Sequence, residues 1–152
     1  MKAKAPRESE VIMTEMVLPH HTNPLGLLLG GQLVNWMDMA AAISAQSHAE
    51  MAAVTASIEK INFLRPVFQG EIVKIIARPI ICFRTSIQIA VEVWKRPITT
   101  GFWQHLIHSQ FTFVGIDKEG KAQPVPAVIP ESPEEIRLYK EAERLRELAK
   151  ES

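Results

Sequence analysis

The sequence predicts an α+β fold that combines one long, buried central α-helix with an antiparallel β-sheet and an added helix at the C-terminal surface. Three observations indicate this arrangement. Residues 32–47 contain neither proline nor glycine and carry apolar residues at helical spacing. Several strand-like segments follow, joined by short connections. A helix-capping sequence then opens a highly charged C-terminal segment.

The size and composition of the chain limit its organisation and its partners. At 152 residues, we expect 1–152 to form a single domain, with the core over about 10–117 and a tail and helix over about 118–152. Hydrophobic residues make up 47% and charged residues 22%, which supplies a core and excludes wholesale disorder. Seventeen basic residues balance seventeen acidic ones, so we expect no nucleic-acid partner.

The sequence also argues against membrane association and secretion. We expect no secretory signal, because no apolar signal region follows the amino terminus. The longest apolar stretch, 24–45, is interrupted by Gln32, Asn35 and Asp38, which are costly in hydrocarbon, so we expect it inside the protein. The single cysteine, Cys82, cannot form an intramolecular disulfide. We therefore expect a cytoplasmic protein with no membrane partner.

The predicted elements begin with a strand over 11–18 and a loop over 20–31 that contains three of the seven glycines. The central helix follows over 32–47. The residues that recur at helical spacing within it are Leu33, Trp36, Met37, Ala40, Ile43 and Ser47. Small residues fill most of the other positions and let a sheet or another helix approach closely, so we expect burial on most sides of this helix.

Four more strands are predicted over 54–63, 71–83, 85–94 and 103–116. The third has the clearest alternation, with Ile87, Ile89, Val91 and Val93 on one face and Ser86, Gln88, Ala90 and Glu92 on the other. The connections are too short for helical crossovers. We therefore expect neighbouring strands to pair antiparallel, as a meander in part.

A capping box opens the last predicted helix. Ser132 can cap the helix, Pro133 suits its first turn, and Glu135 completes the box. The helix is expected to run to about Lys150. Because its apolar stripe is thin and the rest is charged, we expect a surface helix that packs weakly on its own domain or on a partner chain.

Asp38 is the only formally charged residue between Glu15 and Glu50. A carboxylate that loses hydration inside an apolar helix becomes a stronger base or nucleophile once ionised, as acid–base and covalent catalysis require. The alternative is an aspartate on the exposed edge of the helix, beside Asn35 and Ala42. The residue types alone leave both interpretations open.

Gly30 and Gly31 lie where the central helix is expected to begin. Unpaired backbone N–H groups at a helix start can hold an oxyanion, and glycine lets it approach; the alternative is a tight turn that needs positive φ. At about 1.5 Å rise per residue, Asp38 lies roughly 10 to 12 Å farther along the axis, so one carbonyl cannot contact both groups within one chain. If both act, a second copy with an antiparallel helix must supply the carboxylate.

Four histidines and one asparagine are further candidates. Asn23 could polarise a carbonyl or orient water, or it could be an ordinary turn residue. His20 and His21 could serve as a base or a ligand, or as polar loop residues. His105 and His108 are three residues apart on a strand, so we expect them on opposite faces unless a bulge intervenes. No metal site is therefore predicted.

A candidate phosphate contact lies at Arg84, Thr85 and Ser86, which offer one guanidinium and two hydroxyls at the start of a strand. A surface ion pair is the commoner fate of such an arginine. The sequence contains no P-loop, no GxGxxG pattern and no GxSxG nucleophile motif.

Four blocks of sequence carry a family resemblance, namely VLPHHTNPLGLLLGGQLVNWMDMAAAIS, VTASIEKINFLRPVFQGEIV, RTSIQIAVEVW and FTFVGID. Together they resemble the acyl-CoA thioesterases of hotdog fold, over about residues 10–130. The resemblance implies a long helix wrapped by an antiparallel sheet, in homodimers that often assemble into tetramers or hexamers. It also implies hydrolysis of acyl-CoA to free acid and CoA with no cofactor, CoA being part of the substrate.

The resemblance also implies site residues. Asp38 matches the acidic base or nucleophile of the family, Asn23 matches a loop residue that completes the site, and Gly30 and Gly31 match the oxyanion donors at the helix start. The family often has a second acidic residue directly after the aspartate, where this chain has Met39. Whether Asp38 activates water or attacks the thioester directly stays open, as does the length of the acyl chain.

The match is looser elsewhere, and two other functions remain. Arg84, Thr85 and Ser86 match a strand region near the CoA moiety only approximately. One alternative is a hydroxyacyl or enoyl thioester dehydratase or hydratase, in which His20 or His21 would act with the helix carboxylate. The other is a non-catalytic acyl-CoA-binding module.

Overall fold

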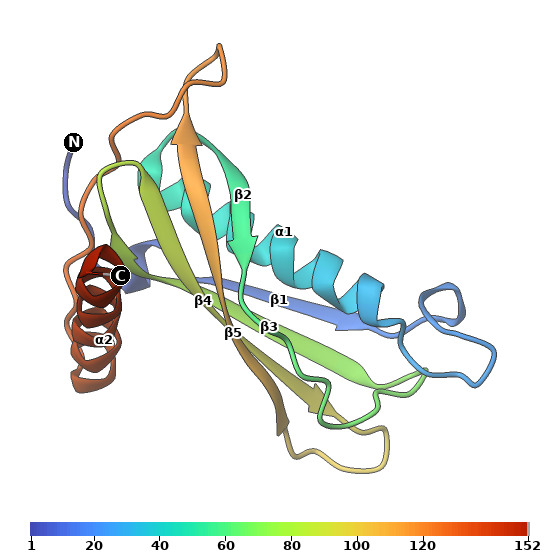
Figure 1. Cartoon of the computed structure of the whole chain (residues 1–152). Coiled ribbons are helices and arrows are strands. Elements are labelled where there is room, and N and C mark those ends of the chain that lie inside the picture. The colour runs from blue at the N-terminus through green and yellow to red at the C-terminus, as the bar shows by residue number, and fades with distance from the viewer. Residues whose placement is uncertain (152) are drawn as a thin grey trace.

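A computed structural model describes residues 1–151 and shows the predicted α+β arrangement. Five strands form one antiparallel sheet in the order β1-β3-β4-β5-β2, which curls around a long helix, α1 (Figure 1). The strands are β1 (Val11–Met16), β2 (Ala52–Ile58), β3 (Ile72–Cys82), β4 (Ser86–Arg96) and β5 (Gln104–Ile116). The helices are α1 (Gly30–Ala49), α2 (Pro133–Glu151) and the short 3-10 turns Pro6–Ser9 and Pro19–His21.

One face of α1 supplies the centre of the core. Its buried residues are Leu33, Trp36, Met37, Ala40, Ala41, Ser44, Ala45, His48 and Ala49. The opposite face stays open, with Met39 and Ile43 each about half exposed. The expected burial on most sides is therefore wrong for the single chain, because the sheet covers only one side of the helix. No helix within residues 1–151 is long and apolar enough to cross a bilayer.

The helix begins two residues earlier than predicted and ends at a defined cap. Gly30 and Gly31 belong to its first turn rather than to the preceding loop. At its other end, Glu50 adopts a left-handed conformation with φ of 55°. The Lys4 ammonium donates to the Ser47 and His48 carbonyls at 3.1 and 3.0 Å. A cation at this position satisfies free carbonyls and complements the negative end of the helix dipole.

The sheet follows the predicted meander only in part. The strands β3, β4 and β5 pair antiparallel in chain order. We expected the segment predicted over 54–63 to pair with the strand that follows it. This expectation is wrong, because β2 pairs antiparallel with β5 at the far edge of the sheet. The reason is that β2 ends at Ile58, so residues 59–71 are free to cross the sheet. Within the described chain, β1 and β2 are the two edge strands.

The inward side of β4 matches the predicted alternation. Ile87, Ile89, Val91 and Val93 are fully buried in the cluster that includes the buried face of α1. The helix α2 lies on the other side of the sheet, where Ile80, Ile81 and Ala142 form a small second cluster. Ala142 is the only buried residue of α2, so this helix packs weakly on the sheet, as its thin apolar stripe predicts.

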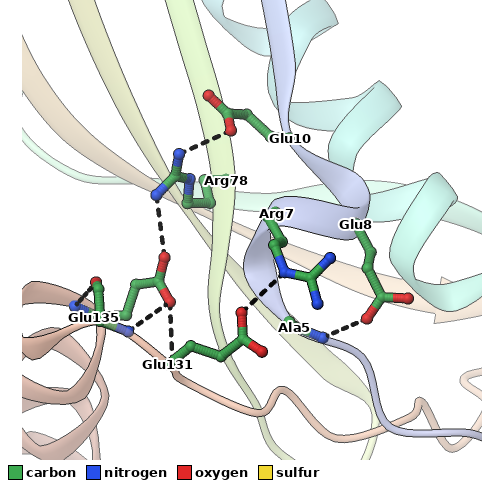
Figure 2. A network of polar contacts seen from close by, with 8 residues as sticks. Ala5, Arg7, Glu8, Glu10, Arg78, Glu131 and Glu135 are labelled. Atoms are coloured by element: carbon green, nitrogen blue, oxygen red, sulfur yellow. Dashed lines mark hydrogen bonds and ion pairs between the residues drawn. The ribbon is translucent and has the colours of Figure 1, made fainter.

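Arg78 on β3 ties the start of α2 and the N-terminal segment to this outer side of the sheet (Figure 2). Its guanidinium donates to Glu10 at 2.7 Å and to Glu135 at 3.0 Å. Glu135 also accepts the backbone N–H groups of Glu131 and Ser132, and its own N–H donates to the Ser132 hydroxyl at 3.1 Å. These bonds confirm the predicted capping box and fix where α2 begins.

A bulge in β5 places two histidines on the same face. Leu106 and Ile107 are both buried at a register shift, so His105 and His108 both emerge on the outer side and bond to the Glu92 carboxylate. The expected opposite faces are therefore wrong, because one extra residue resets the alternation. The bond to Glu92 raises the pKa of His108. Within residues 1–151, no group of three or more His, Cys, Asp or Glu side chains is arranged to hold a metal ion.

The buried histidine at the end of α1 makes stability depend on pH. Burial lowers the pKa of His48 below its ordinary value of 6.5, while its Nε2 bonds to the Pro126 carbonyl at 2.8 Å. Below about pH 6.5 the unfolded chain therefore binds more protons at His48 than the folded chain does. The contribution of the neutral histidine to the free energy of unfolding is fully present above that pH and is lost as the pH falls toward the pKa of His48 in the folded chain. We expect His48→Gln, which keeps a donor toward Pro126, to weaken this acid-dependent loss.

The measurement is the free energy of unfolding by urea at several values from about pH 8 to about pH 5. His20→Gln is the matched control, because His20 is exposed in a loop and its replacement should preserve the wild-type slope. An unchanged slope in His48→Gln would show that this histidine does not limit stability in acid.

Candidate active site

Asn23 organises the loop that precedes α1. Its side-chain Oδ1 accepts hydrogen bonds from the backbone N–H groups of Leu25 and Leu27 at 2.9 and 3.1 Å. The backbone N–H of Asn23 donates to the Leu27 carbonyl at 2.9 Å. Two donors on the oxygen determine which way the amide points. No residue within 1–151 accepts a hydrogen bond from the Asn23 amide nitrogen. The NH2 group is therefore the part of this side chain that is free to meet a ligand.

The first turn of α1 presents two backbone donors. The N-cap residue, Leu29, provides no side-chain acceptor, and its carbonyl accepts the N–H groups of Gln32 and Leu33 at 3.1 and 3.2 Å. The N–H groups of Gly30 and Gly31 have no acceptor among the described residues. They lie at the positive end of the helix dipole, which favours a carbonyl oxygen that gains negative charge.

A pocket of about 240 Å³ lies beside these donors. Its lining is mostly apolar and includes two of the candidate residues; the members are Asn23, Leu27, Leu28, Gly30, Leu33, Phe63, Arg65, Pro66 and Val67. A mostly apolar wall with a few polar groups is typical of small-molecule sites. The structure thus brings Asn23 and the helix start together at one cavity.

The two glycines of the first turn have different surroundings. Neither has a positive φ, so the interpretation as a tight turn is wrong. A Cβ at Gly30 would approach the Phe63 ring to 3.3 Å, a tight contact that the ring would have to relieve by a small shift. A Cβ at Gly31 would meet nothing within 4 Å in the chain. The Gly31 N–H is therefore open to an approaching group.

Asp38 lies two turns into α1, on its half-buried edge. The hydroxyl of Thr55, in the edge strand β2, donates to Asp38 Oδ1 at 2.8 Å, and Oδ2 has no donor among residues 1–151. A single chain does not enclose this carboxylate. Of the two interpretations from the sequence, the single chain therefore shows the aspartate on the edge of the helix rather than one buried inside it. Its orientation comes from Thr55, and any further desolvation requires another molecule.

Gly31 and Asp38 share the open face of α1. Seven residues of helix separate them, which is close to two full turns and about 10 Å along the axis. Because α1 is continuous from Gly30 to Ala49, this separation cannot shorten within one chain. The donor groups and the carboxylate are therefore two distinct parts of one surface.

The loop histidines have structural partners. His21 Nδ1 accepts the Leu18 N–H at 3.0 Å, and the His21 carbonyl accepts the Leu29 N–H at 2.9 Å. The His21 ring packs edge-on against Trp36 of α1 with centroids 4.8 Å apart, and the His20 ring contacts the His21 ring in a tilted arrangement with centroids 4.0 Å apart. These contacts fasten the loop to the helix that follows it.

The structure does not bring Arg84, Thr85 and Ser86 to the pocket of a single chain. They form the turn from β3 into β4, whereas the pocket lies near the other end of β4, toward Arg96. The Arg84 and Thr85 carbonyls accept backbone N–H groups, each at 3.0 Å. Any contact between these residues and a ligand in the pocket would have to come from another copy of the chain.

Comparison with known proteins identifies the family. The model of the thioesterase superfamily matches residues 25–102, which include α1, β2 and all of the pocket lining except Asn23. The chain belongs to this superfamily. The chain is similar to YkhA, an uncharacterized acyl-CoA thioester hydrolase of Bacillus subtilis. That relative is 38% identical over 136 residues, which cover 90% of this chain and 79% of the relative.

Solved structures of thioesterases share the whole fold. A hexameric acyl-CoA thioesterase without ligand matches with a TM-score of 0.92 and 34% identity, covering 99% of this chain and 97% of its own. An acyl-CoA hydrolase of Staphylococcus aureus, in complex with butyryl-CoA, CoA and CoA disulfide, matches with a TM-score of 0.88 and 32% identity, covering 97% and 90%. Structures of the same enzyme with one aspartate, one asparagine or one threonine replaced by alanine match this chain with TM-scores of 0.84 to 0.88.

Thr55 is the polar contact at this candidate site that reasoning from the sequence missed. Its hydroxyl is the hydrogen-bond partner of Asp38, yet it lies 17 residues away on a different element. No spacing rule connects a helix residue with a residue of the next strand. The available signal was a polar, β-branched residue in the strand directly after the helix that carries the candidate aspartate.

The hydrogen bonds of Asn23 yield a structural test. We expect Asn23→Ala to free the N–H groups of Leu25 and Leu27 and to accelerate their hydrogen exchange, because their shared acceptor is lost. Asn23→Asp keeps an acceptor at the same position, so exchange there should stay close to wild type. Hydrogen exchange followed by NMR measures both. Equal protection in the alanine variant would mean that Oδ1 does not hold the loop.

Proposed function

We propose that this protein hydrolyses acyl-CoA thioesters to a free acid and CoA at active sites shared by two copies of the chain. One observation carries the proposal: free amide donors and a free carboxylate oxygen share the open face of α1 but lie about 10 Å apart. A second copy whose α1 runs antiparallel to the first would bring the carboxylate of one chain to the donors of the other. Two equivalent sites would result.

The surface around Asp38 supports pairing with a second copy. Met39 and Ile43 on α1 and Val54 and Ile58 on β2 are each between 40% and 50% exposed. The strand β2 is also an edge, and an unpaired edge beside an apolar face favours another strand. We therefore assign this face to the dimer, with β2 beside β2 of the second copy. The relative solved as a hexamer supports an assembly of three such dimers.

In the proposed reaction, the thioester carbonyl oxygen accepts hydrogen bonds from the Gly31 backbone N–H and from the NH2 group of the Asn23 side chain. The Gly30 N–H lies beside these two donors. These donors stabilise the negative charge that develops as the carbonyl is attacked. Asp38 of the partner subunit either removes a proton from the attacking water or attacks the carbonyl itself, to give an anhydride that water then cleaves. Both routes release CoA as the thiol and use the ionised carboxylate, which the Thr55 hydroxyl orients.

The remaining predicted contacts fit the same arrangement. Arg84, Thr85 and Ser86 lie far from the pocket of their own chain, so we assign them to the CoA moiety of a substrate held by another copy. The three variants of the Staphylococcus aureus hydrolase replace the residue types that meet here, an aspartate, an asparagine and a threonine. The reaction as proposed needs no metal and no organic cofactor.

A mixture of two inactive variants tests whether the site is shared. We expect Asp38→Asn to lower kcat by about a thousandfold while the protein stays folded, since only the base or nucleophile is lost. Asn23→Asp should lower kcat by about a hundredfold, because a donor is replaced by a negative charge. Butyryl-CoA is a suitable substrate, with CoA release followed by a thiol reagent.

The two variants should then complement each other. In a dimer with one chain of each kind, one site contains a wild-type Asn23 and a wild-type Asp38. Random pairing after equal co-expression should therefore restore about a quarter of the wild-type activity. A site within a single chain would give no recovery, and full activity of Asp38→Asn alone would refute the role of this carboxylate.

Thr55 provides a second test. Thr55→Val removes the hydroxyl but keeps the shape, so we expect kcat to fall by about tenfold, the effect of losing one hydrogen bond to a carboxylate. Thr55→Ser restores the hydroxyl and is the matched control. Steady-state kinetics with both variants decides, and equal rates would mean that Asp38 needs no orientation from β2.

The same assays separate the two alternative functions. A dehydratase or hydratase would need a free loop imidazole; His21 Nδ1 already accepts the Leu18 N–H, so His20 would have to supply it. Such an enzyme would hydrate an enoyl-CoA and release no thiol. A non-catalytic binding module would bind CoA esters without turnover, so release of free thiol by the wild-type protein excludes it.

A further inference from the structure

A buried ion pair lies behind the pocket and has no part in the chemistry proposed above. Lys95, near the end of β4, and Glu71, just before β3, have side chains that are only 8% and 7% exposed. The ammonium lies 3.1 and 3.4 Å from the two carboxylate oxygens of Glu71. Buried charges are costly to desolvate, and two apolar residues in their place often stabilise a protein equally well.

The pair closes a short loop that forms one wall of the pocket. The Lys95 ammonium donates to the Pro66 carbonyl at 2.9 Å, and Glu71 Oε1 accepts the Phe68 N–H at 2.7 Å. The Glu71 N–H donates in turn to the Phe68 carbonyl at 3.0 Å. Both ends of the loop 66–71 are thus held by one ammonium, and Pro66 and Val67 of this loop line the pocket.

The same loop holds the segment that presents Asn23 and the helix start. The Leu28 N–H donates to the Val67 carbonyl at 2.8 Å, two residues before Gly30. The Gln69 N–H donates to the Gly26 carbonyl at 2.9 Å, within the turn that Asn23 organises. Hydrogen bonds therefore connect the Lys95 ammonium, through loop 66–71, to residues 26–28. These residues lie between Asn23 and the N–H groups at the start of α1.

We infer that Lys95 and Glu71 are positioning residues for substrate binding, since their hydrogen bonds set the distance between loop 66–71 and the start of α1. This inference rests on the proposed function for its kinetic consequence. An apolar pair could fill the same volume but could not donate to the Pro66 carbonyl or accept the Phe68 N–H. Packing and positioning can therefore be separated by substitution.

The test compares three variants. Lys95→Met leaves the Glu71 carboxylate buried without its partner, and the double variant Lys95→Met with Glu71→Met removes both charges. Arg78→Met is the matched control, because it breaks the ion pairs that hold the N-terminal segment and the start of α2 on the outer side of the sheet, and Arg78 does not line the pocket. Thermal midpoint, hydrogen exchange and steady-state kinetics with butyryl-CoA are measured for all, at a temperature where each is folded.

We expect the double variant to regain much of the thermal stability that Lys95→Met loses, yet to keep a KM raised by about fivefold or more. The N–H groups of Leu28 and Gln69 should exchange faster in both Lys95 variants than in wild type. Arg78→Met should lose stability while its KM stays within about twofold of wild type and these two amides stay protected.

The outcomes keep the two proposals apart. Wild-type KM and exchange in the double variant would show that the pair only fills space, and would overturn the inference. An equal rise of KM in Arg78→Met would do the same, because any loss of stability would then suffice. An inactive wild-type protein would instead refute the proposed function, while the exchange data would still decide whether the pair holds the loop.

Discussion

The packing of α1 against one side of the curled sheet is the constraint on which the other features depend. Met37, Ala40 and Ala41 are fully buried there, so the helix cannot rotate without exposing apolar area to water. Gly31, on the remaining face, is then left uncovered by the sheet, and Asp38 lies at the edge of that face, where it meets Thr55 of the edge strand β2. The candidate site is on the surface of the single chain because its core lies on the other side of the same helix.

The position of the helix start depends on loops rather than on the helix itself. Leu29 provides the first carbonyl of α1, and its own N–H is held by His21. The loop 66–71 holds the same segment through the hydrogen bond from the Leu28 N–H to the Val67 carbonyl, and Lys95 and Glu71 hold this loop in turn. Two loops distant in sequence therefore place the open N–H groups, while propensity for helix formation only determines that a helix follows.

Several features could be predicted and others could not. The central helix, the meander of β3 to β5 and the capping box at Ser132 follow from local periodicity and local bonding, and all three are present. The bulge at Leu106 could not be anticipated, because alternation gives no sign of one extra residue. The pairing of β2 with β5, and the contact of Thr55 with Asp38, depend on how the chain crosses the sheet after Ile58. Patterns of short range carry no such information.

The sequence by itself determined which groups are available: one carboxylate in an apolar stretch, a pair of glycines at a helix start and an asparagine in the preceding loop. It also determined their spacing along the helix, since the rise per residue is nearly constant. Only the tertiary structure decided which face of α1 is covered, which end of the Asn23 amide is free and that Lys95 meets Glu71. These outcomes depend on burial and hydrogen bonds between distant segments, which form only when the sheet closes around the helix.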